Sequence, residues 1–107
     1  MNPILINLNS YKDERGEFYE SYKDILLKQY FIDFNMIQEN TCISNKYVIR
    51  GFHFQKEPHS QAKLLQVLNG KIIDIVINLE TNEILKYVLD SKEKQLLYIP
   101  KGFAHGY

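Results

Sequence analysis

Residues 61–79 read QAKLLQVLNGKIIDIVINL, with an apolar run on each side of Asn69-Gly70. This pattern predicts a two-residue β-hairpin, because both central residues of a type I′ turn need a positive φ. In the second run, the face from Ile73 to Leu79 is wholly apolar, and we expect it to be core. Asp74 lies on the opposite face, between Ile72 and Val76. We expect it inside a barrel; the alternative is an edge charge that opposes aggregation.

The rest of the chain has the same strand-like character. The 8 tyrosines and 6 phenylalanines favour strands. Only residues 22–31 have helical apolar spacing, with Ile25, Leu26 and Tyr30 on one side. The run Ser91–Lys94 is expected to be a solvated turn. Many short strands with one short helix predict an all-β sandwich or barrel. The predicted strands are 4–8, 17–22, 34–43, 47–55, 62–68, 71–79, 84–89 and 95–99.

Length and charge exclude several classes of protein. The 107 residues suit one domain, spanning 1–107. Thirteen basic and 13 acidic side chains cancel, so no overall field attracts nucleic acid or anionic lipid. No apolar run approaches the roughly 20 residues that span a bilayer. Cys42 is a single cysteine and no leader is apparent, so we expect a cytoplasmic protein.

Two segments carry candidate chemistry. In residues 50–55, RGFHFQ, His53 and Gln55 share a strand face, and Arg50 lies on the other face unless a bulge at Gly51 turns it inward. In residues 99–106, IPKGFAHG, Pro and Gly set a turn from which His105 re-enters a strand. Both segments resemble the two motifs of the cupin jelly rolls.

A metal site is not expected. The first cupin motif would supply H-x-H, but Gln55 replaces the second histidine. His53 and His105 alone leave a transition-metal site short of the usual three protein ligands. We therefore expect neither metal nor other cofactor.

Further motifs narrow the resemblance. The segments RGFHFQ, QAKLLQVLNGKIIDIVINL and YIPKGFAHGY, preceded by DERGEFYE at 13–20 and Gln38-Glu39-Asn40, resemble the dTDP-4-dehydrorhamnose 3,5-epimerase family over residues 10–107. The resemblance implies a cupin-type jelly-roll barrel with one short helix. It also implies epimerisation at C3 and C5 of a dTDP-linked 4-keto-6-deoxyhexose, in a pathway of the dTDP-L-rhamnose type.

The resemblance also implies roles for individual residues. His53 would be the catalytic base and Lys63 the cation beside the enolate. An arm carrying Arg15 and Glu20 would reach into the partner's site in a homodimer; the alternative is an ordinary surface pair. The substrate-binding positions implied are Arg15, Phe18, Glu20, Gln38, Asn40, Arg50, Gln55, Asp74 and His105.

The residue types suit this chemistry on their own account. Removing a proton next to a carbonyl needs a base with a pKa near neutrality and a positive group near the oxygen. His53 and Lys63 can supply both. Arg15 and Arg50 can each bind a diphosphate through paired hydrogen bonds.

The chain departs from the family pattern in one important respect. The family's general acid is a tyrosine beyond the segment that ends at Gly106, and Tyr107 takes the place of the aromatic residue that follows the motif. We expect the family's C-terminal strands to be missing. The chain is then either a fragment or a reduced relative. Two rival functions stay open, a nucleotide-sugar binding module without turnover and a sugar 3,4-ketoisomerase, whose relatives carry the H-x-H that Gln55 interrupts.

Overall fold

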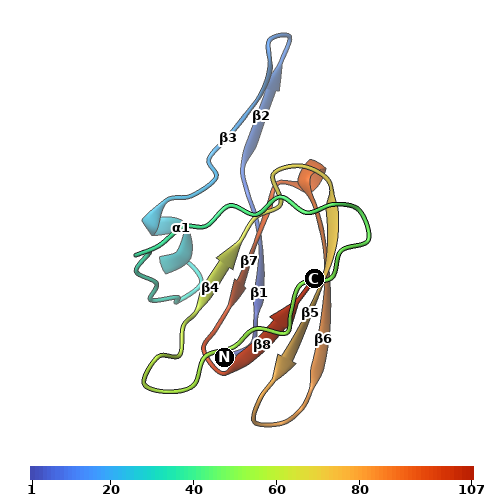
Figure 1. Cartoon of the computed structure of the whole chain (residues 1–107). Coiled ribbons are helices and arrows are strands. Elements are labelled where there is room, and N and C mark those ends of the chain that lie inside the picture. The colour runs from blue at the N-terminus through green and yellow to red at the C-terminus, as the bar shows by residue number, and fades with distance from the viewer.

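The computed structural model describes all 107 residues and contains eight strands, one short α-helix and one 3₁₀ helix (Figure 1). None of its helices is long and apolar enough to cross a membrane. The elements are β1 (Ile4–Asn7), β2 (Ser10–Asp13), β3 (Gly16–Tyr19), α1 (Asp24–Lys28), β4 (Lys63–Leu65), β5 (Lys71–Asn78), β6 (Ile84–Asp90), the 3₁₀ helix η1 (Ser91–Glu93), β7 (Gln95–Ile99) and β8 (Phe103–Gly106).

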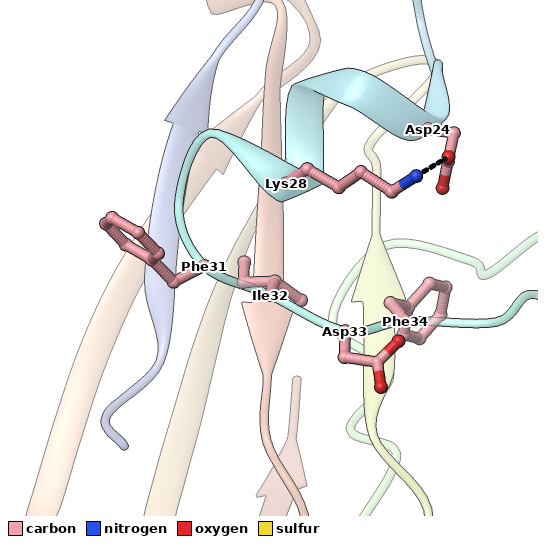
Figure 2. Close-up of a pocket in the computed structure, with 6 residues that line it drawn as sticks. All are labelled: Asp24, Lys28, Phe31, Ile32, Asp33 and Phe34. Atoms are coloured by element: carbon pink, nitrogen blue, oxygen red, sulfur yellow. Dashed lines mark ion pairs between the residues drawn. The ribbon is translucent and has the colours of Figure 1, made fainter.

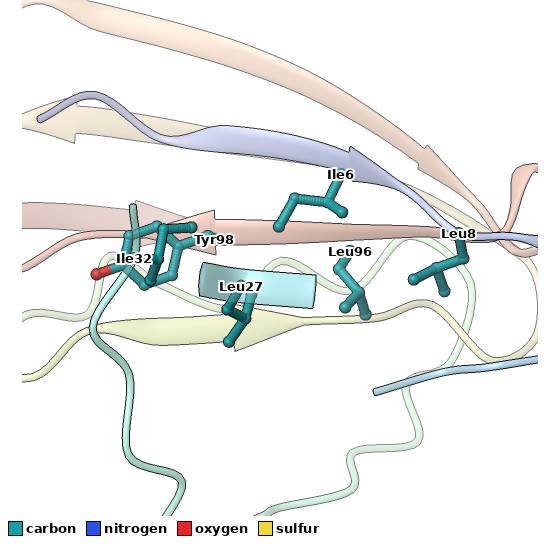
Figure 3. Close-up of a cluster of buried hydrophobic side chains, with 6 residues drawn as sticks. All are labelled: Ile6, Leu8, Leu27, Ile32, Leu96 and Tyr98. Carbon is teal, nitrogen blue, oxygen red and sulfur yellow. The ribbon is translucent and has the colours of Figure 1, made fainter. Parts of the chain in front are cut away.

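Two antiparallel sheets form the body, with strand orders β1-β7-β4 and β6-β5-β8. Strand β7 packs on both faces, because its side chains alternate. Leu97 and Ile99 point inward, with Val76, Leu89 and Phe103. On the other face, Leu96 and Tyr98 pack with Ile6, Leu8, Leu27 and Ile32 (Figure 3). The all-β, jelly-roll architecture predicted from the sequence is therefore confirmed.

The single helix lies where the sequence predicts it, but a different side chain anchors it. Asp24 in the first turn and Lys28 in the last suit the helix dipole, and they form an ion pair of 2.7 Å. Five residues are too few for an independent helix, so packing must hold it. Leu27 is only 1% exposed, whereas Ile25 is 58% exposed. On the predicted face, Leu26 packs partly against the same cluster, so the prediction is right at Leu26 and wrong at Ile25 and Tyr30, which are exposed.

The hairpin predicted at Asn69-Gly70 is also wrong. Strand β4 pairs with β7 in one sheet, whereas β5 pairs with β6 and β8 in the other. Gly70 has a φ of 96°, but Asn69 does not share the positive φ that a type I′ turn needs. The segment instead carries the chain from one sheet to the other. Leu65 in one sheet and Val76 in the other both point into the space between the sheets.

The strands predicted at 34–43 and 47–55 are not formed. Residues 35–59 are exposed throughout, and their strand-like pairing is confined to Arg50 with Tyr107 and His53 with His105. In Figure 1 this stretch, coloured from teal to yellow-green, winds around the two sheets before it reaches β4. A period-two pattern marks residues that could form a strand, but a strand also needs a free edge to pair with.

The core face of β5 is the reverse of the one predicted. Asp74 and Val76 are fully buried, so their face points inward. Ile73 and Leu79, on the wholly apolar face, are 48% and 42% exposed. Asp74 is thus an interior residue, as expected, and not an edge charge.

The N-terminal hairpin of β2 and β3 stands apart from the body (Figure 1). Its strands pair only with each other, in a separate two-stranded sheet. Only β3 overlaps a predicted strand, at 17–22, and β2 was not predicted. Both strands are exposed along nearly their whole length.

The packing of α1 makes a direct prediction. Leu27→Ala should lower the free energy of unfolding by about 2–5 kcal/mol, because it opens a cavity in the cluster that covers the outer face of β7. Ile25→Ala, on the same helix, should change it by less than about 0.5 kcal/mol. Urea denaturation of both variants checks this, and equal losses would contradict the assignment of the buried face.

Candidate active site

The candidate site is built where β8 meets the segment that carries RGFH. His53 and His105 exchange both backbone hydrogen bonds, at N···O distances of 2.8 and 3.1 Å. Arg50 and Tyr107 do the same, at 2.6 and 2.8 Å. Two residues, Gly51 and Phe52, therefore lie opposite one, Gly106, which is a β-bulge. The extra residue places Arg50 and His53 on the same face, as the sequence suggested for a bulge at Gly51.

The bulge depends on two glycines. A Cβ on Gly106 would lie 2.9 Å from the carbonyl oxygen of Arg50 and 3.2 Å from the Cα of Gly51. A Cβ on Gly51 would lie 2.6 Å from the Cα of Gly106. The two backbones can approach this closely only because neither residue has a side chain.

A buried, hydrogen-bonded pair of His105 and Asp74 lies next to this bulge. His105 pairs with Val76 in the β5–β8 register, and so lies on the inner face with Asp74. The Nδ1 of His105 is 3.1 and 3.3 Å from the two carboxylate oxygens of Asp74. Asp74 is fully buried and His105 is 5% exposed. A carboxylate accepts hydrogen bonds, so Nδ1 is the donor and Asp74 fixes the orientation of the ring.

His53 lies beside this pair, on the side open to solvent. Its ring centroid lies 6.3 Å from that of His105, at an interplanar angle of 63°. Unlike His105, His53 is exposed. One imidazole is therefore held inside the barrel while the other is open to a ligand.

Lys63 lies at the beginning of β4, opposite Ile99. Because Ile99 belongs to the inner cluster, Lys63 faces the space between the two sheets, and Leu65 and Val67 continue that wall. Burial lowers the pKa of Lys63 below its ordinary value of 10.5. The lysine is therefore not the fully solvated strand residue that was the alternative to a site residue.

Two residues that the sequence interpretation left aside also belong here. The Tyr107 ring lies 6.1 Å from that of His105, and burial raises the pKa of Tyr107. Hydrogen bonds with Ser44 and, to a smaller extent, with Tyr107 lower the pKa of the Cys42 thiol. Ser44 also accepts a 2.8 Å bond from Nε of Arg50. Tyr107 could have been predicted from the sequence, because a residue two positions after His105 lies on the same face of an extended chain. No sequence pattern points to Cys42.

The remaining body residues of the predicted site lie in the exposed stretch. The amide of Gln38 donates to Oδ1 of Asn40 at 3.1 Å, so these two side chains share a face. Gln55, two residues after His53, is exposed. Across the chain, no group of three His, Cys, Asp or Glu side chains is arranged to hold a metal ion.

The structure does not bring the N-terminal candidates to this site within one chain. Arg15 pairs with Asp13 at 2.6 Å, and Glu20 pairs with Lys23 at 2.7 Å. Arg15 and Glu20 therefore do not form the surface pair that was the alternative. Phe18 is 67% exposed on the hairpin.

A separate hollow of about 330 Å³ lies beside α1 (Figure 2). It lies on the side of β7 opposite the inner face, because its residue Ile32 packs in the outer cluster. It contains none of the predicted site residues. Its lining is Asp24, Lys28, Phe31, Ile32, Asp33 and Phe34.

The fold and the site together define a cupin-type jelly roll with paired histidines and a buried aspartate on the inner face. A family model described as dTDP-4-dehydrorhamnose 3,5-epimerase matches residues 2–107. The chain belongs to this family.

Relatives and solved structures agree. The dTDP-4-dehydrorhamnose 3,5-epimerase of Methanothermobacter thermautotrophicus is 34% identical, over 97% of this chain and 58% of its own length. The Bacillus anthracis enzyme, solved with TDP and PPi bound, has a TM-score of 0.91 at 34% identity and covers 97% of this chain and 63% of its own.

A third relative was solved with a sugar nucleotide. The dTDP-6-deoxy-D-glucose-3,5-epimerase of Legionella pneumophila, in complex with dTDP-4-keto-L-rhamnose, has a TM-score of 0.88 at 34% identity. The match covers 97% of this chain and 58% of that one. The chain thus spans about three-fifths of the length of these three relatives.

The glycine contact at the bulge can be tested directly. Gly106→Ala should lower the free energy of unfolding by about 1–3 kcal/mol, because its Cβ has to push the Arg50 backbone away. It should also shift the imidazole NMR signals of His53 and His105. Gly70→Ala is the control: it meets no atom within 4 Å, so it costs only the strain of a φ of 96°. Unchanged imidazole signals in the Gly106 variant would contradict this account.

Proposed function

We propose that this chain carries the base and the cation for epimerisation at C3 and C5 of a dTDP-linked 4-keto-6-deoxyhexose, in a pathway of the dTDP-L-rhamnose type. The observation that supports this most is the pair of histidines on the inner face, one open and one held by Asp74, with Lys63 facing the same space. We further propose a cytoplasmic enzyme, as the sequence suggests.

The first step is removal of a proton next to the ketone. His53 takes the proton through a ring nitrogen, the C–H bond breaks, and its electron pair moves to the carbonyl oxygen to give an enolate. An exposed imidazole suits this role, because its ring nitrogen can reach a bound substrate and accept the proton. Inversion then requires a proton to return on the opposite face.

The enolate needs positive charge that is already in place. Lys63 can supply it, because a half-buried ammonium interacts more strongly with a developing oxyanion than a solvated one does. Because its pKa is lowered, Lys63 loses its charge at a lower pH than an exposed lysine does. We therefore expect the reaction rate to begin falling at a lower alkaline pH than it would with an exposed lysine. His105, oriented by Asp74 through Nδ1, has its Nε2 free to accept a hydrogen bond from a hydroxyl of the same sugar.

The diphosphate would meet arginines. Arg50 lies beside the bulge, on the face of His53, and Arg15 lies at the tip of the hairpin. Because Arg15, Phe18 and Glu20 are remote from His53 in one chain, we propose that they act at the site of a second copy. Gln38, Asn40 and Gln55 would line the rest of the sugar nucleotide site.

A binding module without turnover is the second candidate. It is favoured by the positions of two inner-face phenols, Tyr107, which follows β8 on the face of His105, and Tyr87, which pairs with Asp74 on β6. Both belong to the sheet whose edge carries His53, so both lie on the same side of the site as the base. A proton returned from that side would restore the original configuration.

The decisive experiment follows substrate protons in deuterated buffer. The wild-type chain, given the dTDP-4-keto-6-deoxyhexose, should incorporate deuterium at C3 or C5. His53→Ala should lower the rate by at least about 10²-fold, because it removes the base. Lys63→Met should lower it by about 10²-fold or more while dTDP affinity stays nearly unchanged, because the cation acts on the enolate.

His59→Ala is the matched control. His59 is exposed, and its backbone N–H bonds only to the carbonyl of Lys56, so this variant should exchange like the wild type. Binding of the sugar nucleotide without any deuterium uptake would leave the binding module as the function. No binding at all would overturn both proposals.

The proposed second copy makes a separate prediction. Sedimentation velocity at micromolar concentration should give twice the 12.7 kDa mass of the chain. Phe18→Asp should shift the protein towards monomer, because it places a charge on the aromatic face of the hairpin. Phe31→Asp is the control, since Phe31 is 92% exposed beside α1. A wild-type monomer would contradict the exchange of arms.

A further inference from the structure

The β2–β3 hairpin has two different faces. Residues directly opposite in an antiparallel pair share a face, and the register pairs Tyr11 with Phe18, Ser10 with Tyr19 and Lys12 with Glu17. Tyr11 and Phe18 are 59% and 67% exposed. The other face, with Ser10, Glu17 and Tyr19, is turned towards the body.

Two parts of the body contact this second face: the outer cluster packs against Tyr19, and Lys94 supplies the charged contact. The Lys94 ammonium lies 3.6 Å from Oε1 of Glu17 and 5.0 Å from the centroid of the Tyr19 ring. The other carboxylate oxygen of Glu17 accepts a hydrogen bond from the hydroxyl of Ser10. Lys94 thereby connects both strands of the hairpin to the connection between β6 and β7.

Lys94 is itself held firmly. Its ammonium donates to the carbonyl of Ser91 at 2.8 Å, and its own carbonyl accepts from the N–H of Leu8 at 2.9 Å. The Lys94 side chain is only 20% exposed. Its backbone has a φ of 50°, which residues other than glycine seldom adopt. The solvated turn predicted for 91–94 is therefore a 3₁₀ turn that ends on a half-buried anchor.

Lys94 contacts the chain near both ends of the hairpin, through its carbonyl at one end and its ammonium at the other. The carbonyl of Lys94 holds Leu8, just before β2 begins, and its ammonium holds Glu17 and Tyr19, as β3 ends. Without the ammonium, the hairpin would be joined to the body only through its two connecting segments and through the packing of Tyr19, at the end of β3, against the outer cluster. With it, the aromatic face of Phe18 points in one direction, away from the body.

We infer that Lys94 is a positioning residue, which fixes the direction of the hairpin so that Arg15 and Phe18 can engage a nucleotide diphosphate at the site of a second copy. This rests on the proposed function for its second half. The first half, the anchoring of the hairpin, is independent of any ligand. The two halves can therefore be tested separately.

The test compares Lys94→Met with Lys92→Met, which removes an exposed lysine from the same turn, and with Lys94→Arg, which keeps the cation. Backbone ¹⁵N relaxation should give order parameters for residues 11–18 of about 0.85 in the wild type and below about 0.6 in Lys94→Met. Affinity for dTDP should fall about three- to tenfold in Lys94→Met. Lys92→Met should match the wild type, and Lys94→Arg should recover both properties.

Each other outcome counts against a defined part. Unchanged order parameters in Lys94→Met would overturn the anchor. A loosened hairpin with unchanged dTDP affinity would overturn the positioning role, if Arg15→Ala weakens dTDP binding in the same assay. If the wild-type chain does not bind dTDP, the proposed function fails, and the order parameters still decide whether Lys94 holds the hairpin.

Discussion

The candidate site depends on the burial of Asp74 beside His105. A carboxylate with no exposure to water is tolerated only with a partner, and His105 Nδ1 at 3.1 Å is that partner. The pair requires β5 and β8 to be neighbours in a fixed register. Once β8 is fixed, its free edge receives the segment Arg50–His53, and the bulge there turns His53 to the same face. A change at Asp74 would therefore affect the base as well as its neighbour.

The arrangement of the two sheets explains why one side of β7 carries a hydrophobic cluster and the other side carries the candidate site. The outer face is closed by Leu27 and Ile32, which cover Leu96 and Tyr98 of β7. The inner face combines Leu97 and Ile99 with polar groups at one end, where Lys63, Asp74 and His105 lie. The same strand thus serves as core and as one wall of the site.

The chain also presents surfaces that its own body does not use. Ile37, Ile43 and Ile49 are each more than four-fifths exposed, and so is Tyr47. About two-fifths of the length of the relatives compared above lies outside the match, so the comparisons bear on the fold of the matched part. The amphipathic hairpin adds a second unused surface, whose direction we attribute to Lys94.

The sequence by itself determined the fold class, the position of the helix, the turn before His105 and the family. These depend on local patterns, such as Pro100-x-Gly102 and the alternation in residues 71–79, which act through the backbone whatever the rest of the chain does. The resemblance to the family also singled out His53, Lys63, Asp74 and His105 as candidate site residues.

Tertiary structure decided which faces and edges are used. Both faces of β5 are largely apolar in sequence, and only the position of the second sheet makes the Asp74 face the inner one. Asn69-Gly70 has the composition of a hairpin, but burial of β4 and β5 in opposite sheets separates the two runs. Residues 34–55 alternate like strands, yet only Arg50 and His53 find a free edge, because pairing depends on a partner far away in the chain. Lys94 became an anchor for the same reason, since Glu17 and Tyr19 reach it only after the chain has folded.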